Sequence, residues 1–142
     1  MSDKNVKIAN GFIFNSKLDE VVLITTDQKI WTGFKCISEE NENIIDKLNT
    51  KIKEYTNQTI KQESWRQASD LINLEKTWSS TIYMTVTSNL ENFCIPNDNC
   101  KIRIFRISSL DSNQCPISIL WKIYLCLDTN IHGSLSRIVY YV

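Results

Sequence analysis

The regular spacing of apolar residues between Asn43 and Asn57 constrains the fold of this chain more than any other feature of its sequence. Side chains three and four positions apart lie on one face of an α-helix, so the spacing predicts a helix over residues 43–57 with one buried face. Asn57 is its expected end, because asparagine tolerates the left-handed backbone conformation better than most residues do. The apolar positions of this face are Ile44, Ile45, Leu48, Ile52 and Tyr55.

A second apolar run predicts another helix over residues 116–127. Pro116 suits the first turn of a helix, where its missing N–H group costs nothing. We expect this second helix to be deeply buried, with Leu120 and Trp121 in the core. Its apolar positions are Ile117, Leu120, Trp121, Tyr124 and Leu127.

Segments rich in β-branched and aromatic residues are expected to form strands around these two helices. Residues 11–14 and 20–26 are predicted strands joined by a turn at 15–19, and residues 29–36 form a shorter extended piece. Because strands, helix, strands, helix and strand follow one another, we expect an α+β fold with a mixed β-sheet sandwiched between helices. The remaining strands are expected at residues 64–74, 77–88, 101–107 and 137–142, with a loop at 89–99.

The bulk properties are those of one globular domain over residues 1–142, with 42% hydrophobic and 23% charged residues. Sixteen basic residues balance sixteen acidic ones, so binding to nucleic acid or to a membrane would need a local patch. The absence of a signal-peptide-like or membrane-spanning apolar run predicts a cytoplasmic protein that binds no membrane. The many Asn, Lys and Ile residues indicate an AT-rich genome, so the cytoplasm would be that of a microbe or a virus-infected host cell.

Five cysteines, an odd number without C-x-x-C spacing, predict reduced thiols rather than a zinc site or a disulfide framework. Cys94 and Cys100 bracket a loop-like segment, and a bridge between them stays open.

The stretch from Trp31 to Ile60 resembles the Nudix box, G-x5-E-x7-R-E-U-x-E-E-x-G-U, aligned without a gap. The family's W-x-x-P-G-G lead-in falls on residues 31–36, and the first glutamate of the box falls on Glu42. The R-E-U-x-E-E-x-G-U segment falls on residues 50–58. The resemblance implies a Nudix-like fold.

The flanking segments are similar to the same family, so the resemblance spans most of the chain. Residues 8–15 and 21–24 are similar to its opening strands, and Trp65-Arg66 with Thr77-Trp78 to its following hairpin. Residues 120–128 are similar to its C-terminal helix, which in some members carries a tryptophan that stacks on a purine; here that residue would be Trp121.

The resemblance also implies that the metal chemistry of the family is lost. Nudix hydrolases cleave a nucleoside diphosphate linked to another group, using magnesium held by glutamates of the box helix. Magnesium requires hard oxygen ligands, but Lys51 and Tyr55 stand in two of these glutamate positions and only Glu54 remains. The Lys51 ammonium can pair with Glu54 three positions away and would repel a divalent ion. The paired glycines and the box arginine are also replaced, by Lys35, Cys36 and Thr50.

Three functions are compatible with these residues. The leading hypothesis is a catalytically degenerate Nudix-fold module, without metal or cofactor, that binds a nucleotide, RNA or a protein partner, including a second copy. The alternative is a divergent hydrolase in which Glu42 and Glu54 are catalytic and Glu54 holds magnesium. The third is a structural subunit with an empty cleft. The expected ligand-binding residues are Trp31, Lys51, Glu54 and Trp121, although core packing is the commoner role of a tryptophan.

Overall fold

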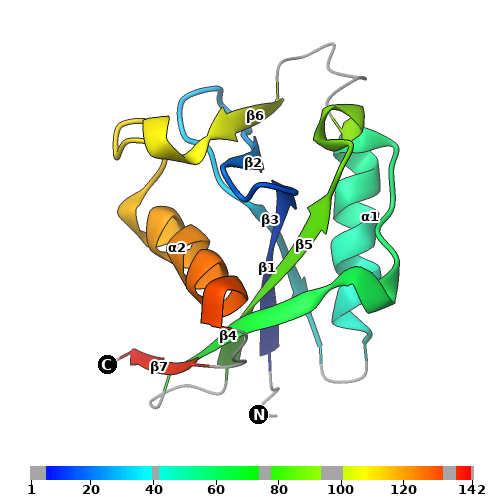
Figure 1. The fold of residues 1–142 in the computed structure, drawn as a ribbon. Coiled ribbons are helices and arrows are strands. Elements are labelled where there is room, and N and C mark those ends of the chain that lie inside the picture. The colour runs from blue at the N-terminus through cyan, green and yellow to red at the C-terminus, as the bar shows by residue number, and fades with distance from the viewer. Residues whose placement is uncertain (1–5, 40–41, 74–77, 94–100, 133–136, 142) are drawn as a thin grey trace.

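A mixed seven-stranded sheet forms the centre of the molecule and separates the two helices, α1 (Ile44–Thr56) and α2 (Ile117–His132) (Figure 1). The computed structural model describes residues 6–39, 42–73, 78–93, 101–132 and 137–141. This arrangement confirms the expected α+β fold with a sheet between helices. The strands are β1 (Val6–Asn15), β2 (Glu20–Ile24), β3 (Phe34–Ser38), β4 (Arg66–Asn73), β5 (Trp78–Thr87), β6 (Ile102–Arg106) and β7 (Arg137–Tyr141).

The long strand β1 organises the sheet, whose order is β6-β2-β1-β5-β4-β7. Along one edge, the C-terminal part of β1 pairs antiparallel with β2 and its N-terminal part pairs antiparallel with β3. Along its other edge β1 pairs with β5 in parallel, and β4 pairs with β7 in parallel, which makes the sheet mixed. Strands β2 and β3 thus follow one another along the same edge of β1.

The helix α1 matches the predicted range to within one residue at each end. The Asn43 side chain caps its start by accepting hydrogen bonds from the backbone N–H groups of Ile45 and Asp46. Asn57 ends it in the left-handed conformation, with φ 61°, and its N–H donates to the Lys53 carbonyl. The buried face, which packs on β1 and β3, consists of Ile45, Leu48, Ile52 and Thr56.

The buried face of α2 differs from the predicted one. Ile117 is 73% exposed and Tyr124 is 53% exposed, while Leu120 and Trp121 are only partly buried. This helix carries apolar residues on nearly every face, so their spacing does not single out the side that packs on the sheet. The side chains that are buried instead are Ile119, Ile123, Leu125 and Cys126.

Two smaller expectations also need correction. The extended piece expected from residue 29 begins as a strand only at Phe34, after an isolated bridge between Ile24 and Thr32. The loop expected over residues 89–99 begins with a 3-10 helix, Leu90–Phe93, and Cys94 and Cys100 lie outside the described residues. Two further 3-10 helices span Gln62–Ser64 and Ile107–Ser109.

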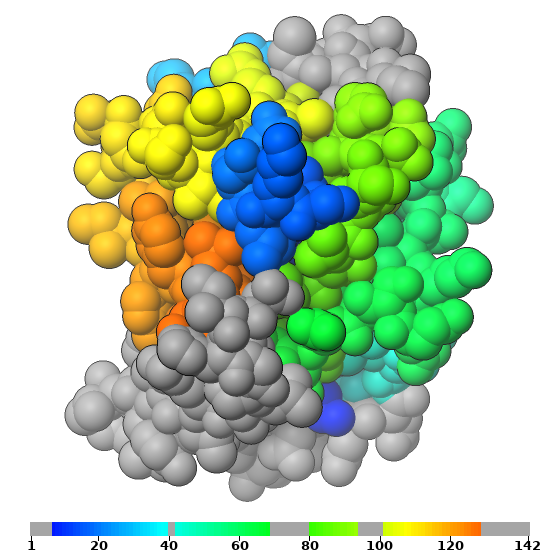
Figure 2. All heavy atoms as spheres, in the orientation of Figure 1, coloured from blue at the N-terminus to red at the C-terminus, as the bar shows by residue number. Residues whose placement is uncertain are grey.

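The two helices occupy opposite sides of the molecule, and the turn that joins β1 to β2 lies at the surface between them (Figure 2). One apolar cluster fills the α1 side of the sheet and a second fills the α2 side. Within the described part of the chain, neither helix has the length and apolar character needed to cross a membrane.

Candidate functional site

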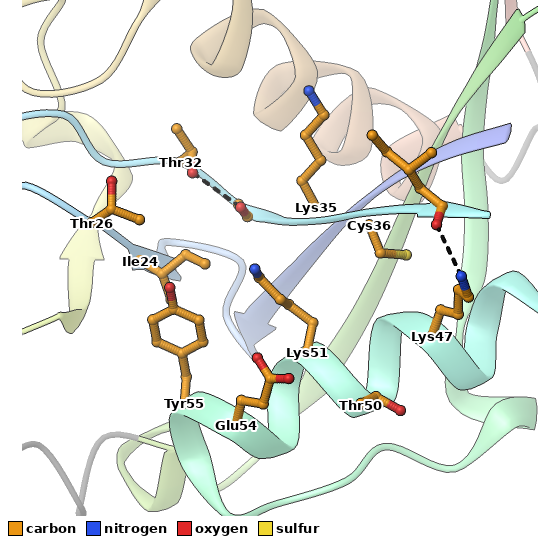
Figure 3. A pocket seen from close by; sticks show the side chains of 12 residues that line it. Ile24, Thr26, Thr32, Lys35, Cys36, Lys47, Thr50, Lys51, Glu54 and Tyr55 are labelled. Atoms are coloured by element: carbon orange, nitrogen blue, oxygen red, sulfur yellow. Dashed lines mark hydrogen bonds between the residues drawn. The ribbon is translucent and has the colours of Figure 1, made fainter. Parts of the chain in front are cut away.

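A pocket of about 740 Å³ lies between α1 and β3, in the region predicted from the sequence (Figure 3). Its size falls in the range of about 300–1,000 Å³ that is usual for small-ligand sites. Strands β2 and β3 and the segment between them contribute Ile24, Thr26, Thr32, Gly33, Lys35, Cys36 and Ile37. The helix α1 contributes Lys47, Thr50, Lys51, Glu54 and Tyr55.

The helical spacing explains why these α1 residues share the pocket. Positions 47, 50, 51, 54 and 55 recur at intervals of three and one, so they form a stripe directly beside the buried stripe that holds the helix on the sheet. Tyr55 lies at the border of the two stripes, where its ring packs edge-on against Phe34 with centroids 6.1 Å apart. The residues that anchor α1 therefore also fix the direction of the pocket stripe.

The charged residues that line the pocket are Lys35, Lys47, Lys51 and Glu54. Lys51 extends from α1 into the space below β3 (Figure 3), and its Nζ lies 5.8 Å from the centroid of the Tyr55 ring. The spacing of Lys51 and Glu54 allows an ion pair, but within the described ranges no ion pair joins these two side chains. Lys35 is directed away from α1 (Figure 3).

Glu42 and Lys47 form an ion pair outside the centre of the pocket, with 2.7 Å between Oε2 and Nζ. The other carboxylate oxygen of Glu42 accepts a hydrogen bond from the Glu39 N–H, at 2.8 Å. The hydrogen bond from Lys47 and that from Glu39 lower the pKa of the Glu42 carboxyl. Lys47 also donates to the Ile37 carbonyl, at 3.4 Å, so both partners of this pair tie the start of α1 to β3.

The thiol of Cys36 lies where the two pocket lysines act together. Burial raises its pKa, while the nearby positive charges of Lys47 and Lys51 oppose this increase. Its sulfur donates to the Ile44 carbonyl at 3.7 Å. The pKa of the thiol stays raised, because burial outweighs the two positive charges.

The residues present do not fit the magnesium site of a Nudix box. Among the residues that the structure describes, Glu54 is the one carboxylate that lines the pocket, and both oxygens of Glu42 already have partners. Glu42 precedes the helix, and Glu54 lies in its last turn. Because an α-helix rises about 1.5 Å per residue, Glu54 is about 15 Å along the axis from the first residue of α1. The two carboxylates cannot share one ion. No group of three or more His, Cys, Asp and Glu side chains suited to a metal occurs among the described residues.

The two tryptophans expected at the site lie outside the pocket wall. Trp31 is only 4% exposed; its ring centroid is 5.0 Å from that of Phe105, and the Arg103 guanidinium lies 4.9 Å from the ring. Trp121 belongs to α2 and packs against the apolar cluster on that side of the sheet. Of the four predicted ligand-binding residues, Lys51 and Glu54 line this pocket, and Trp31 and Trp121 do not.

Several pocket residues were missed by the sequence reasoning, notably Ile24, Thr26 and Thr32. Ile24 ends β2, and Thr26 and Thr32 belong to the segment between β2 and β3. No local sequence pattern marks these three residues as pocket residues. The pairing of Ile24 with Thr32 brings them together. A second cavity of about 270 Å³ shares these three residues and extends along the 25–30 loop, so the pocket continues in that direction.

Comparison with solved structures defines the fold as Nudix-like. A NUDIX hydrolase from Nitrosomonas europaea superimposes with a TM-score of 0.70 at 13% identity, over 99% of this chain and 81% of the other. An ADP-ribose pyrophosphatase from Streptococcus suis gives 0.68 at 13% identity, over 99% and 100% of the two chains. NrtR from Shewanella oneidensis, solved with a 27mer DNA, gives 0.67 at 12% identity, over 89% and 62%. No family model and no curated protein matches the sequence.

Proposed function

We propose that this chain is a non-hydrolytic Nudix-fold module that binds a phosphate-bearing nucleotide in the pocket between α1 and β3. The observation that carries the proposal is the position of Lys51. Lys51 lines the pocket at a position where the Nudix box has a glutamate. Its ammonium forms no ion pair in the described part of the chain. An ammonium group attracts phosphate and repels a divalent cation, so one residue both removes the metal site and favours the ligand.

The shape and composition of the pocket support a ligand with one charged and one uncharged part. Lys47 lies at one end of the pocket, Lys51 and Glu54 lie in the middle, and Ile24, Thr26 and Thr32 line the other end (Figure 3). A nucleotide has this polarity, since its phosphates are anionic and its nucleoside is uncharged. The fold itself does not require hydrolysis, because similar architecture occurs in a pyrophosphatase and in a protein solved with DNA.

The test combines a binding assay and a turnover assay on the full chain. We expect nucleoside di- and triphosphates to raise the melting temperature, because a ligand that binds only the folded state stabilises it. We expect hydrolysis of nucleoside triphosphates, dinucleoside polyphosphates and nucleotide sugars with magnesium or manganese to stay at background. Turnover that depends on magnesium and disappears in Glu54→Gln would contradict the proposal and favour the divergent hydrolase. Absence of both turnover and binding would favour a structural subunit.

A double variant, Lys51→Glu with Tyr55→Glu, provides a direct check on the metal argument. It places three carboxylates on the pocket stripe of α1, together with Glu54, so we expect its affinity for magnesium to rise well above that of the wild type. The matched control is Lys53→Glu, which adds a carboxylate to the same helix at an exposed position outside the pocket. Equal magnesium affinity in both variants would show that the pocket stripe is not what limits metal binding.

A further inference from the structure

We propose that the pocket holds its nucleotide as the metal-free polyphosphate, with Lys51 in the role of the divalent ion, so that magnesium opposes binding. This inference rests on the proposed nucleotide-binding function and specifies the ionic form of the ligand. It reverses the usual relation for a nucleotide site, in which magnesium bridges carboxylates and phosphates.

The Lys51 ammonium has no ion pair in the described part of the chain and is therefore free to meet an anion. It is only half-buried, it stands in the middle of the pocket stripe, and its described contact is with the Tyr55 ring, 5.8 Å from the ammonium. A ring contact at this distance contributes little at an exposed site. A phosphate oxygen can therefore approach the ammonium without breaking an existing ion pair.

Lys47 carries the neighbouring ammonium group of the pocket stripe, but it is already paired and held in place. Its ion pair with Glu42 and its hydrogen bond to the Ile37 carbonyl fix the ammonium at the pocket edge. Lys47 and Lys51 are one helical turn apart on the pocket stripe, and Cys36 lines the pocket opposite them. A phosphate group placed there meets one unpaired and one prepositioned cation.

Glu54 is the single carboxylate among the described residues of the pocket stripe. Glu54 is exposed and lies three positions from Lys51 on the same stripe. One carboxylate beside an ammonium group is a weak ligand for magnesium, because the positive charge of Lys51 acts against the ion. A magnesium–nucleotide complex also carries two fewer negative charges than the free nucleotide. Both effects lower the attraction between the pocket and the complex.

The experiment measures the Kd of the full chain for ADP by titration calorimetry, once with EDTA and once with saturating magnesium. Ionic strength is matched with KCl, because magnesium salts also screen charges. We expect binding to be roughly tenfold tighter without magnesium, equivalent to about 1.4 kcal/mol. Lys51→Gln should weaken binding in EDTA and abolish the difference between the two conditions. Lys53→Gln, which removes an exposed charge from the same helix but not from the pocket, should behave as wild type.

The outcomes separate this inference from the function on which it rests. Tighter binding with magnesium, or ADP binding that ignores both magnesium and Lys51→Gln, would overturn the inference and leave a nucleotide-binding module. No ADP binding in either condition would overturn the nucleotide-binding function together with the inference. A melting curve of each variant confirms that it is folded, so a loss of binding in Lys51→Gln reports on the pocket.

Discussion

The contact between Gly11 on β1 and Leu48 on α1 allows a quantitative test of how the helix is seated. Leu48 is fully buried, and a Cβ atom added at Gly11 would lie 2.9 and 3.1 Å from its two methyl carbons. Leu48→Ala should lower the free energy of unfolding by about 2–5 kcal/mol, through lost burial and the cavity left behind. Gly11→Ala should lower it by about 1–3 kcal/mol, because Leu48 must shift in a closely packed core.

The two changes together should cost less than the sum of the single changes. Leu48→Ala removes the methyl groups that the new Cβ would meet, so the Gly11→Ala step becomes neutral or stabilises by about 0.4–1 kcal/mol through lower unfolded-state entropy. The coupling energy should therefore reach about 1–4 kcal/mol, which is the difference between the two costs of Gly11→Ala. Urea unfolding, followed by circular dichroism and analysed by linear extrapolation, measures all four corners of the cycle.

Gly33→Ala is the control for this cycle. Its added Cβ would lie 2.6 Å from the Phe12 ring and 3.0 Å from the Gly11 carbonyl, with no atom of Leu48 among its three nearest neighbours. Leu48→Ala should therefore not rescue it. If the costs of Gly11→Ala and Leu48→Ala instead add to within about 0.5 kcal/mol, the close packing of α1 on β1 is refuted.

Three further predictions concern the ends of α1 and the pocket wall. Asn57→Ala should destabilise by about 1–2 kcal/mol in urea unfolding whereas Asn57→Gly should not, because φ is 61° and only the alanine change is strained; equal effects would contradict this. The ion pair with Lys47 lowers the pKa of Glu42, so its contribution is present above the usual carboxyl pKa and lost as the pH falls through the lowered one. The stability difference between wild type and Glu42→Gln should thus shrink between about pH 6 and about pH 3, and a constant difference would count against it. Alkylation of Cys36, followed by mass spectrometry, should be slower in Lys51→Gln than in wild type, because loss of the cation lets burial raise the thiol pKa further; faster alkylation would show that Lys51 shields the thiol instead.

The parts of the fold that the sequence predicted are those with a local cause. The helix α1 has apolar residues on one face only and an asparagine at each end, so its range and its buried residues Leu48 and Ile52 were predictable. The helix α2 was found, but its buried face was not, because apolar side chains surround it. The parallel pairing of β1 with β5 depends on residues about 70 positions apart, for example Asn10 and Ser80, whose side chains hydrogen-bond across the sheet.

The candidate site divides in the same way. Lys51 and Glu54 belong to the helix, and an ungapped resemblance was enough to place them in the pocket. Thr26 and Thr32 reach the pocket through strand pairing, which their own sequence neighbourhood does not encode. Trp31 lies at the start of the resembling segment, but its position depends on contacts with Arg103 and Phe105, far away in the chain. Because of tertiary packing, Trp31 therefore lies outside the pocket, whereas Thr26 and Thr32 line it.

The two stripes of α1 separate the residues that support the Nudix-like fold from those that line the pocket. The buried stripe, with Leu48 and Ile52 at its centre, holds the helix on β1 and β3 and depends only on apolar shape. The pocket stripe, with Lys51 and Glu54, faces solvent and contributes little to that packing. A change from glutamate to lysine on the second stripe alters the charge of the pocket without disturbing the first. The fold and the charge of the pocket are thus specified by different faces of one helix, so under the proposed function the pocket face, rather than the fold, selects the ligand.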